Sequence, residues 1–242
     1  MKKNFLKVTF ATDKNSWILP HLKKFVAQIK PKIKKVDLVF KSKDIKKGDL
    51  AFFLSFQEIV RQNILNKNTN ILVQGITGSE GLFHAEQMIE YSSKVVCGVT
   101  PGKGGQKATS KQLPVFNSIH DAKKEFQIDA TVIFVPPRFA AKAIMEAIQE
   151  NIELIVCISE GIPTRDMVTV KNMLDKSSST LIGPNCPGVI TAEESKIGIT
   201  PGFICKKGSV GILSRSGTLT YEAIDQVVNV GLGITTAVGI GG

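Results

Sequence analysis

The sequence is poor in the residues that build metal centres and disulfide scaffolds. Its 242 residues include three histidines and four cysteines. The cysteines, Cys97, Cys157, Cys186 and Cys205, are scattered without metal-ligand spacing, which is typical of a reducing compartment rather than of a disulfide-bonded secreted domain. We therefore expect no metal site, and a location in the cytoplasm of a bacterium or in the mitochondrial matrix of a eukaryote.

Long apolar runs are absent as well. No run approaches the roughly 18–20 residues of a membrane span, and residues 1–6 lack the apolar core and small-residue cleavage site of a secretory signal. Hydrophobic residues nevertheless make up 43% of the chain, an ordinary fraction for a protein that buries a core. The sequence thus predicts a globular protein with no membrane partner.

The positive charge is confined to one part of the chain. Residues 1–68 hold 16 lysines and arginines against 5 aspartates and glutamates, a balance of +11, whereas residues 69–242 carry −1. This shift marks a boundary between two pieces of different origin or role. A basic excess can mark a nucleic-acid or membrane footprint, but the even spread of these lysines favours a solvated surface. We expect no nucleic-acid partner.

Apolar runs and helical periodicity alternate along the chain. Strands are predicted over 5–11, 35–40 and within 48–55, with a helix over 17–30. Further strands are predicted over 70–74, 94–99, 131–135, 154–158, 180–183, 209–213 and 235–240, and helices over 79–91, 118–126, 138–150, 164–175 and 217–230. This repetition predicts an α/β protein with a doubly wound parallel sheet, whose ligands bind at the carboxyl ends of the strands.

Two glycine-rich loops follow successive predicted strands. The first, residues 75–81, lies between a strand and a helix, where backbone N–H groups can approach a phosphate. The second, residues 100–105, carries Lys103 where a dinucleotide-binding fold usually has an acid for the ribose hydroxyls. A lysine there suits a phosphorylated ribose, as in CoA or NADP. Tight turns without a ligand, and a surface lysine, are the alternatives to this interpretation.

A third turn, Ser214 to Gly217, follows the strand predicted over 209–213. Ser214 or Ser216 is a good helix N-cap, and the helix behind it offers a second anion site, although capping alone explains these serines. Cys186 lies in a rigid Gly-Pro-Asn-Cys-Pro-Gly turn with no histidine nearby in sequence, so a nucleophilic role is disfavoured. His21, His84 and His120 have no partner at triad or ligand spacing and are expected to be non-catalytic.

The motifs taken together resemble one family, the α subunit of succinyl-CoA synthetase (succinate–CoA ligase), over about three quarters of the chain. The residues that carry the resemblance are 68–70, 74–81, 100–105, 113–117, 135–137, 159–163, 183–188, 196–199, 214–223 and 238–242. The resemblance implies a Rossmann-like CoA-binding domain over 67–200 and the start of a flavodoxin-like ligase domain over 201–242. A short α/β segment of separate origin over 1–66 precedes them.

The family converts succinyl-CoA, phosphate and a nucleoside diphosphate into succinate, CoA and the triphosphate. The resemblance therefore implies a tricarboxylic acid cycle ligase that works as a heteromer with a β subunit and binds CoA, succinate and phosphate. Magnesium and ATP or GTP would act only through the β subunit. The site residues that it implies are Thr77, Gly78, Ser79, Glu80, Lys103, Ile158, Ser159 and Glu160 for CoA, Ser214, Ser216, Gly217 and Thr218 for phosphate, and Tyr221 for substrate shared with the β subunit.

One family feature lies outside this sequence. The phosphohistidine of the family belongs to a Gly-His-Ala-Gly segment downstream of the position of Gly242, so we expect no catalytic residue here, an incomplete catalytic unit and no autophosphorylation. A non-catalytic CoA- or dinucleotide-binding module is the alternative. An NADP oxidoreductase is disfavoured because no Tyr-Lys or Ser-Tyr hydride-transfer pair is visible. Residues 1–66 faintly resemble the opening of formyltransferases, through 8–12 and 48–55, which suggests a fused or truncated gene.

Overall fold

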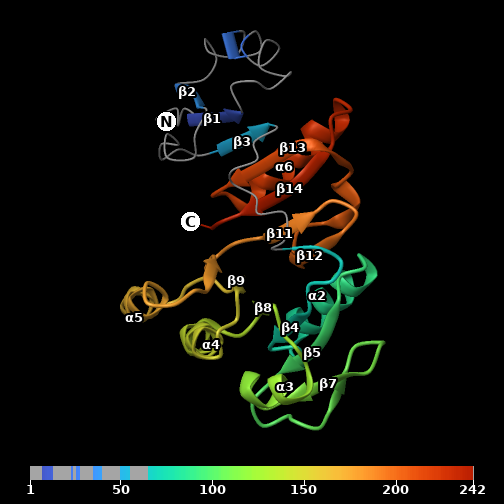
Figure 1. Cartoon of the computed structure of the whole chain (residues 1–242), viewed down its shortest axis with the longest axis vertical. Coiled ribbons are helices and arrows are strands. Elements are labelled where there is room, and N and C mark those ends of the chain that lie inside the picture. Colours follow the sequence, from blue (N-terminus) through green and yellow to red (C-terminus); the bar gives the residue numbers. More distant parts are fainter. Residues whose placement is uncertain are drawn as a thin grey trace.

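The computed structural model describes residues 7–12, 23, 26–27, 35–39, 50–54 and 65–241. Two seven-stranded sheets organise this part of the chain, one built from residues 71–182 and the other from the N-terminal strands together with residues 188–239. In Figure 1 the sheet of residues 71–182 lies below the other, and the N-terminal strands lie beside the red and orange strands of the upper sheet.

The lower sheet has the strand order β10-β9-β8-β4-β5-β7-β6. Its strands are β4 (Ile71–Gln74), β5 (Val95–Val99), β6 (Lys107–Ala108), β7 (Leu113–Phe116), β8 (Ala130–Ile133), β9 (Leu154–Cys157) and β10 (Thr180–Ile182). All pairings are parallel except that of the edge strand β6 with β7. With β4 as the first strand, this is the Rossmann order, and its switch point lies between β4 and β8.

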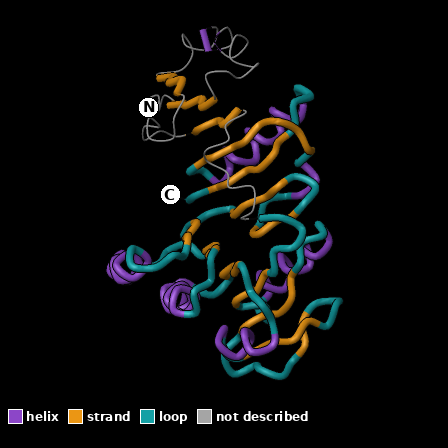
Figure 2. Tube along the Cα trace, viewed as in Figure 1, coloured by secondary structure: helices purple, strands orange, loops and turns teal. Residues whose placement is uncertain are grey.

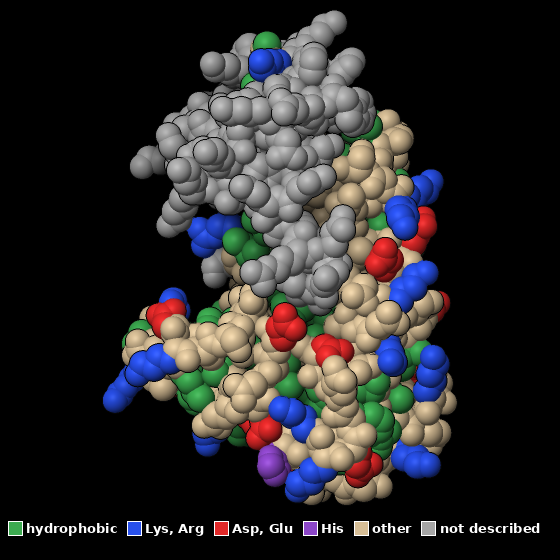
Figure 3. Space-filling view, viewed as in Figure 1, with side chains coloured by type: hydrophobic (Ala, Val, Ile, Leu, Met, Phe, Trp, Pro, Cys, Tyr) green, Lys and Arg blue, Asp and Glu red, His purple; other side chains and the backbone are tan. Residues whose placement is uncertain are grey.

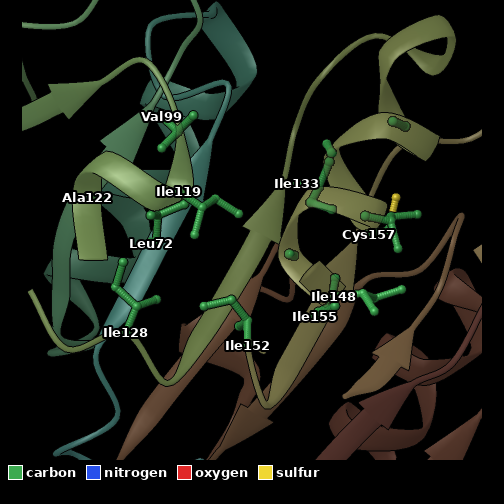
Figure 4. Packing of buried hydrophobic residues seen from close by; sticks show 14 of the residues in the cluster. Leu72, Val99, Ile119, Ala122, Ile128, Ile133, Ile148, Ile152, Ile155 and Cys157 are labelled. Carbon is green, nitrogen blue, oxygen red and sulfur yellow. The ribbon is translucent and has the colours of Figure 1, made fainter. Parts of the chain in front are cut away.

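Helices cover both faces of this sheet. They are α2 (Ser79–Glu90), α3 (Ile119–Glu125), α4 (Pro137–Gln149) and α5 (Thr164–Leu174). All four residues of β4, β8 and β9 are buried, as expected for strands with cover on each side. Residues of α3, α4 and α5 join one hydrophobic cluster and residues of α2 join the other. In Figure 4, Leu72 and Val99 of the sheet lie beside Ile119 and Ala122 of α3.

The upper sheet is mixed, with the order β12-β11-β14-β13-β3-β1-β2. Its strands are β1 (Lys7–Thr12), β2 (Lys35–Val39), β3 (Leu50–Leu54), β11 (Gly188–Thr191), β12 (Ser195–Gly198), β13 (Lys207–Ser214) and β14 (Ile234–Gly239). Helix α6 (Gly217–Asn229) connects the parallel pair β13 and β14, and a short 3-10 turn, η3 (Gly202–Ile204), precedes β13. The pairings β3–β13, β11–β14 and β11–β12 are antiparallel. Figure 2 shows the sheet as a row of orange segments.

The β11–β12 hairpin joins the two sheets. The hydroxyl of Ser93, at the end of α2, donates to the Lys196 carbonyl at 2.9 Å and accepts from the Lys196 N–H at 2.8 Å. Val189 and Ile197 of the hairpin belong to the same hydrophobic cluster as Ile71 and Val73 of β4. The hairpin of the upper sheet therefore packs on the lower sheet, on the same face as α2.

The structure confirms the α/β class and the Rossmann-like sheet, but the sequence did not predict the antiparallel pairings of the upper sheet. It also missed β6, β7, β11 and β12. The predicted boundary at residue 200 falls after β11 and β12, which pair in the upper sheet, and the division of the chain into three parts stays a prediction. Of the helix expected over 17–30, only residues 23, 26 and 27 are described, and they are helical. His21 lies outside the described residues.

Candidate functional site

Four loops meet at one edge of the lower sheet. They follow β4, β5, β8 and β9, whose parallel pairing places all four carboxyl ends together. In an open parallel sheet this edge, at the switch point, is where ligands bind. These loops and the first turn of α2 contain all eight residues that the sequence analysis assigned to CoA.

The first loop is shaped by glycine. Gly75 has φ +81, a left-handed conformation that favours glycine, and a Cβ on Gly81 would lie 2.1 Å from the Gly75 carbonyl oxygen. Gly78 is the N-cap of α2 and makes no side-chain capping bond. The N–H groups of the first turn, at Ser79 and Glu80, therefore face the carboxyl edge without a capping side chain, at the positive end of the helix dipole.

The second loop is tied to the first by two threonine hydroxyls. The Thr77 hydroxyl donates to Thr100 Oγ1 at 3.1 Å, and Thr100 donates in turn to the Val99 carbonyl at 2.9 Å. Lys103 is exposed, three residues after Thr100. The structure thus links the glycine loop after β4 to the loop after β5 that carries the lysine.

The loop after β9 completes this edge. The Ser159 hydroxyl donates to the Val135 carbonyl at 2.5 Å, which ties the β9 loop to the β8 loop. That hydroxyl is already engaged, so it is not a free donor for a ligand. Ile158 is partly buried and Glu160 is exposed, so the loop presents one apolar and one acidic side chain.

The candidate phosphate site lies at the N-terminus of α6, and its serines bond within their own turn. The Ser216 hydroxyl accepts from the Leu219 N–H at 3.2 Å, and the Ser216 N–H donates to Ser214 Oγ at 3.1 Å. A Cβ on Gly217 would meet nothing within 4 Å. An anion here would therefore meet the backbone of Gly217 and Thr218 rather than free serine hydroxyls.

The segment Gly183–Gly188 lies between the two candidate sites. The Asn185 N–H donates to the Ser159 carbonyl at 3.0 Å, on the side of the first site. On the other side, a Cβ on Gly241 would lie 2.1 Å from the Pro184 carbonyl oxygen, and a Cβ on Gly239 would lie 2.1 Å from Pro187 Cγ. This segment therefore contacts both the loop after β9 and the end of β14.

Cys186 lies within the Gly183–Gly188 segment, and Tyr221 lies near it on α6. Cys186 is 4% exposed, and its thiol donates to the Cys157 carbonyl at 3.2 Å. Burial raises the pKa of the Cys186 thiol to about 11, which keeps it protonated at neutral pH and disfavours a nucleophilic role. Burial first, and the charge of Cys186 second, raise the pKa of Tyr221. Tyr221 is thus a half-buried, neutral phenol near the Gly183–Gly188 segment.

Neither described histidine has the surroundings of a catalytic base. The His84 ring stacks on Phe134, with centroids 5.3 Å apart, and burial lowers its pKa. His84 Nε2 lies 3.7 Å from a Glu80 carboxylate oxygen. His120 is exposed on α3, with Nδ1 3.3 Å from Glu150 Oε1. Packing and a surface ion pair account for these two side chains.

A polar cavity of about 290 Å³ lies at the opposite edge of the sheet, where β4, β8 and β9 begin. It is lined by Asn66, Asn68, Thr69, Gln127, Asp129, Glu153 and Leu154. Its two carboxylates and lack of a lysine or arginine make it unsuited to a phosphate ligand. Within the described ranges, no group of three or more histidines, cysteines and acids gathers, and no helix there is long and apolar enough to cross a membrane.

The visible surface of the described residues carries both signs of charge. Figure 3 shows lysines, arginines and acids interspersed over the lower part of the molecule rather than separated by sign. Most of the basic residues of the first 68 positions lie outside the described ranges. The expectation of no nucleic-acid partner therefore stays a prediction.

Comparisons with known proteins match the part of the chain that contains this sheet. The model of the CoA binding domain family matches residues 66–161. Over 178 residues, 74% of this chain, the sequence is 56% identical to the α subunit of ADP-forming succinate–CoA ligase from Staphylococcus aureus and 54% identical to that from Staphylococcus epidermidis. The chain spans 58% of the length of these relatives.

The fold also resembles solved structures of larger proteins. ATP citrate lyase from Methanothrix soehngenii, in complex with citrate and coenzyme A, matches 74% of this chain and 32% of its own, with a TM-score of 0.64 at 25% identity. A dinucleotide-forming acetyl-coenzyme A synthetase from Ca. Korarchaeum cryptofilum matches the fold with a TM-score of 0.61 at 18% identity.

Proposed function

We propose that this chain, which is homologous to succinate–CoA ligase α subunits over about three quarters of its length, binds CoA across the carboxyl edge of its lower sheet. The observation that carries the proposal is the coupling of two glycine loops through Thr77 and Thr100. This coupling supports a site in which uncapped helix N–H groups and Lys103 act on the same ligand. A pyrophosphate and a phosphorylated ribose need these two features together.

Each residue in the proposed pocket has a physical task. The backbone N–H groups of Thr77, Ser79 and Glu80 bind the pyrophosphate, because they lie at the positive end of α2. The Gly78 N–H instead donates to the Gly75 carbonyl at 3.0 Å and shapes the loop. Lys103 takes the place of the acid that binds ribose hydroxyls in NAD enzymes, and so favours a ribose that carries a phosphate. Ile158, Ser159 and Glu160 close the pocket on the side of β9.

The second anion site fits inorganic phosphate. Gly217 and Thr218 begin α6, where nothing lies within 4 Å of a Cβ placed on Gly217, and a helix N-terminus favours an anion. Ser214 and Ser216 hold this turn in shape. Tyr221, one turn further along, is proposed to face substrate shared with a β subunit.

The whole reaction belongs to this proposal. The Gly183–Gly188 segment contacts the CoA side and the phosphate side, which is the arrangement needed to bring the acyl group of succinyl-CoA to phosphate. We propose that a β subunit supplies the nucleotide and its magnesium, and that the assembly acts in the cytoplasm, as expected for a bacterial metabolic enzyme. No step is assigned to His84 or His120, whose surroundings are those of packing and a surface ion pair.

A direct titration tests the proposed ligand. The purified 242-residue chain is titrated with CoA and, separately, with NADPH by isothermal calorimetry. The Lys103→Ala variant is titrated in the same way, and Lys67→Ala, at the other edge of the sheet, is its control because it removes the same charge. We expect saturable CoA binding that is tighter than NADPH binding and that Lys67→Ala leaves unchanged. Tighter binding of NADPH, or no binding of CoA, would contradict the proposal.

A further inference from the structure

Asn117, which directly follows β7, makes two hydrogen bonds to the loop that carries Lys103. Its side-chain oxygen, Oδ1, accepts from the N–H of Gly102 and from the N–H of Gly104, each at 2.9 Å. These two residues flank Lys103 in the sequence. One side-chain oxygen therefore holds both the Pro101–Gly102 and the Lys103–Gly104 peptide units.

The backbone of this loop forms two successive turns that meet at Lys103. The Lys103 N–H donates to the Thr100 carbonyl at 3.0 Å, and the Gln106 N–H donates to the Lys103 carbonyl at 3.3 Å. Gly102 has φ +79 and Gly105 has φ +86, the positive φ that the third position of a type II turn requires. The backbone of Lys103 is thus fixed while its side chain stays exposed.

Asn117 can approach the loop closely because Gly104 has no side chain. A Cβ on Gly104 would lie 2.5 Å from Asn117 Nδ2, so glycine lets the loop close onto the asparagine. The charge of the acceptor matters as well. An aspartate could accept the same two bonds, but its negative charge beside Lys103 would oppose an incoming anion.

We propose that Asn117 is a positioning residue, which holds Lys103 for the 3′-phosphate on the ribose of CoA and so sets a preference for CoA over dephospho-CoA. This inference rests on the proposed CoA function. The Thr77–Thr100 bond keeps the lysine loop and the pyrophosphate loop at a fixed separation. A ligand with both phosphates then meets two prepared sites, whereas dephospho-CoA meets one.

A double-mutant cycle tests the inference on the full chain. CoA and dephospho-CoA are titrated against the wild type, Asn117→Ala, Lys103→Ala and the double variant. We expect Asn117→Ala to weaken CoA binding about tenfold, the size of the charged hydrogen bond between Lys103 and the 3′-phosphate that would be lost, and to leave dephospho-CoA binding within about twofold. The double variant should bind CoA no worse than Lys103→Ala, because the asparagine acts through the lysine.

Two further variants make the test specific. Asn68→Ala removes an exposed asparagine at the opposite edge of the sheet and should change neither affinity. Asn117→Asp keeps the acceptor, so it should keep the thermal unfolding temperature of the wild type while losing the preference for CoA. If Asn117→Ala does not fold, Asn117→Asp decides the question.

Several results would overturn the positioning role. They are equal losses for both ligands, additive losses in the double variant, or an unchanged preference in Asn117→Asp. Each would mean that Asn117 only stabilises the loop. A wild-type chain that binds neither ligand would instead refute the proposed CoA function itself, so the two failures are distinguishable.

Discussion

Single residues determine whether a ligand can approach the carboxyl edge of the lower sheet. Gly81 and Gly75 let the loop after β4 close on itself, and Thr77 links that loop to Thr100. The sequence predicted the glycine turns and the presence of Lys103 in the second of them, because glycine after an apolar run marks a turn by itself. It did not predict the Thr77–Thr100 bond or the role of Asn117, because these contacts join residues 23 and 13–15 positions apart.

Gly81→Ala should disturb the glycine loop after β4. The added Cβ would lie 2.1 Å from the Gly75 carbonyl oxygen, and overpacking of this kind costs about 1–3 kcal/mol. We expect a lower midpoint of thermal unfolding and weaker CoA binding. Gly217→Ala is the matched control, since a Cβ there meets nothing within 4 Å and the midpoint should stay unchanged. A wild-type midpoint for Gly81→Ala would show that the loop is not closed in this way.

Ser216→Ala distinguishes a helix cap from a ligand-binding hydroxyl. The Ser216 side chain accepts from the Leu219 N–H, so its loss should cost about 1 kcal/mol in the free energy of unfolding. Urea unfolding without phosphate measures this cost. Stability equal to that of the wild type would mean that the hydroxyl is free for a ligand rather than engaged in the cap.

At the scale of elements, the sequence predicted best what is buried from both sides. Strands β4, β8 and β9 are continuous apolar runs, and the helices around them have clear periodicity. The missed strands are short, and they include Pro114, Gly188 and Lys196, which are unfavourable signals for a strand. Their pairing comes from contacts with β5, β14 and α2, which a local pattern does not contain.

The strand β3 covers an edge of β13. Residues 50–54 pair antiparallel with residues 210–214, so the first part of the chain completes the upper sheet. Ala51→Pro removes a backbone donor from β3. We expect a loss of about 1–3 kcal/mol in the stability of the upper sheet with CoA affinity unchanged. An unchanged unfolding curve for Ala51→Pro would contradict this pairing.

At the scale of the whole molecule, the resemblance to succinate–CoA ligase α subunits is confirmed by 56% identity over 178 residues. The lower sheet and the α6 turn then carry the two proposed anion sites, and the Gly183–Gly188 segment contacts both regions. The sequence predicted both sites as separate turns. It could not predict that one segment contacts both, because that depends on how the β11–β12 hairpin packs against the lower sheet.

Three buried thiols and the partly buried thiol of Cys205 make the stability of the whole molecule depend on pH. Burial raises the pKa of Cys97, Cys157 and Cys205 from 9.0 to about 12 and that of Cys186 to about 11. Below pH 9 the thiols are neutral in both the folded and the unfolded chain, so their ionisation does not change the free energy of unfolding. Above it the unfolded chain releases protons first, so the free energy of unfolding falls toward pH 11, by at most about 1.4 kcal/mol per pH unit for each thiol.

Urea unfolding at pH 8, 9 and 10 measures this fall. Lys196 acts in the opposite direction, because burial lowers its pKa, but it is one group against four. Cys97→Ala should make the dependence on pH less steep. Stability that is constant or rising over this range would contradict the burial of the thiols.

The central claim is that CoA binds across the two coupled glycine loops, and a crystal structure of the chain with CoA tests it most directly. The account predicts the pyrophosphate at the N-terminus of α2 and the 3′-phosphate in contact with the Lys103 ammonium. CoA bound elsewhere, for example in the polar cavity at the opposite edge of the sheet, or bound with Lys103 away from every phosphate, would contradict it.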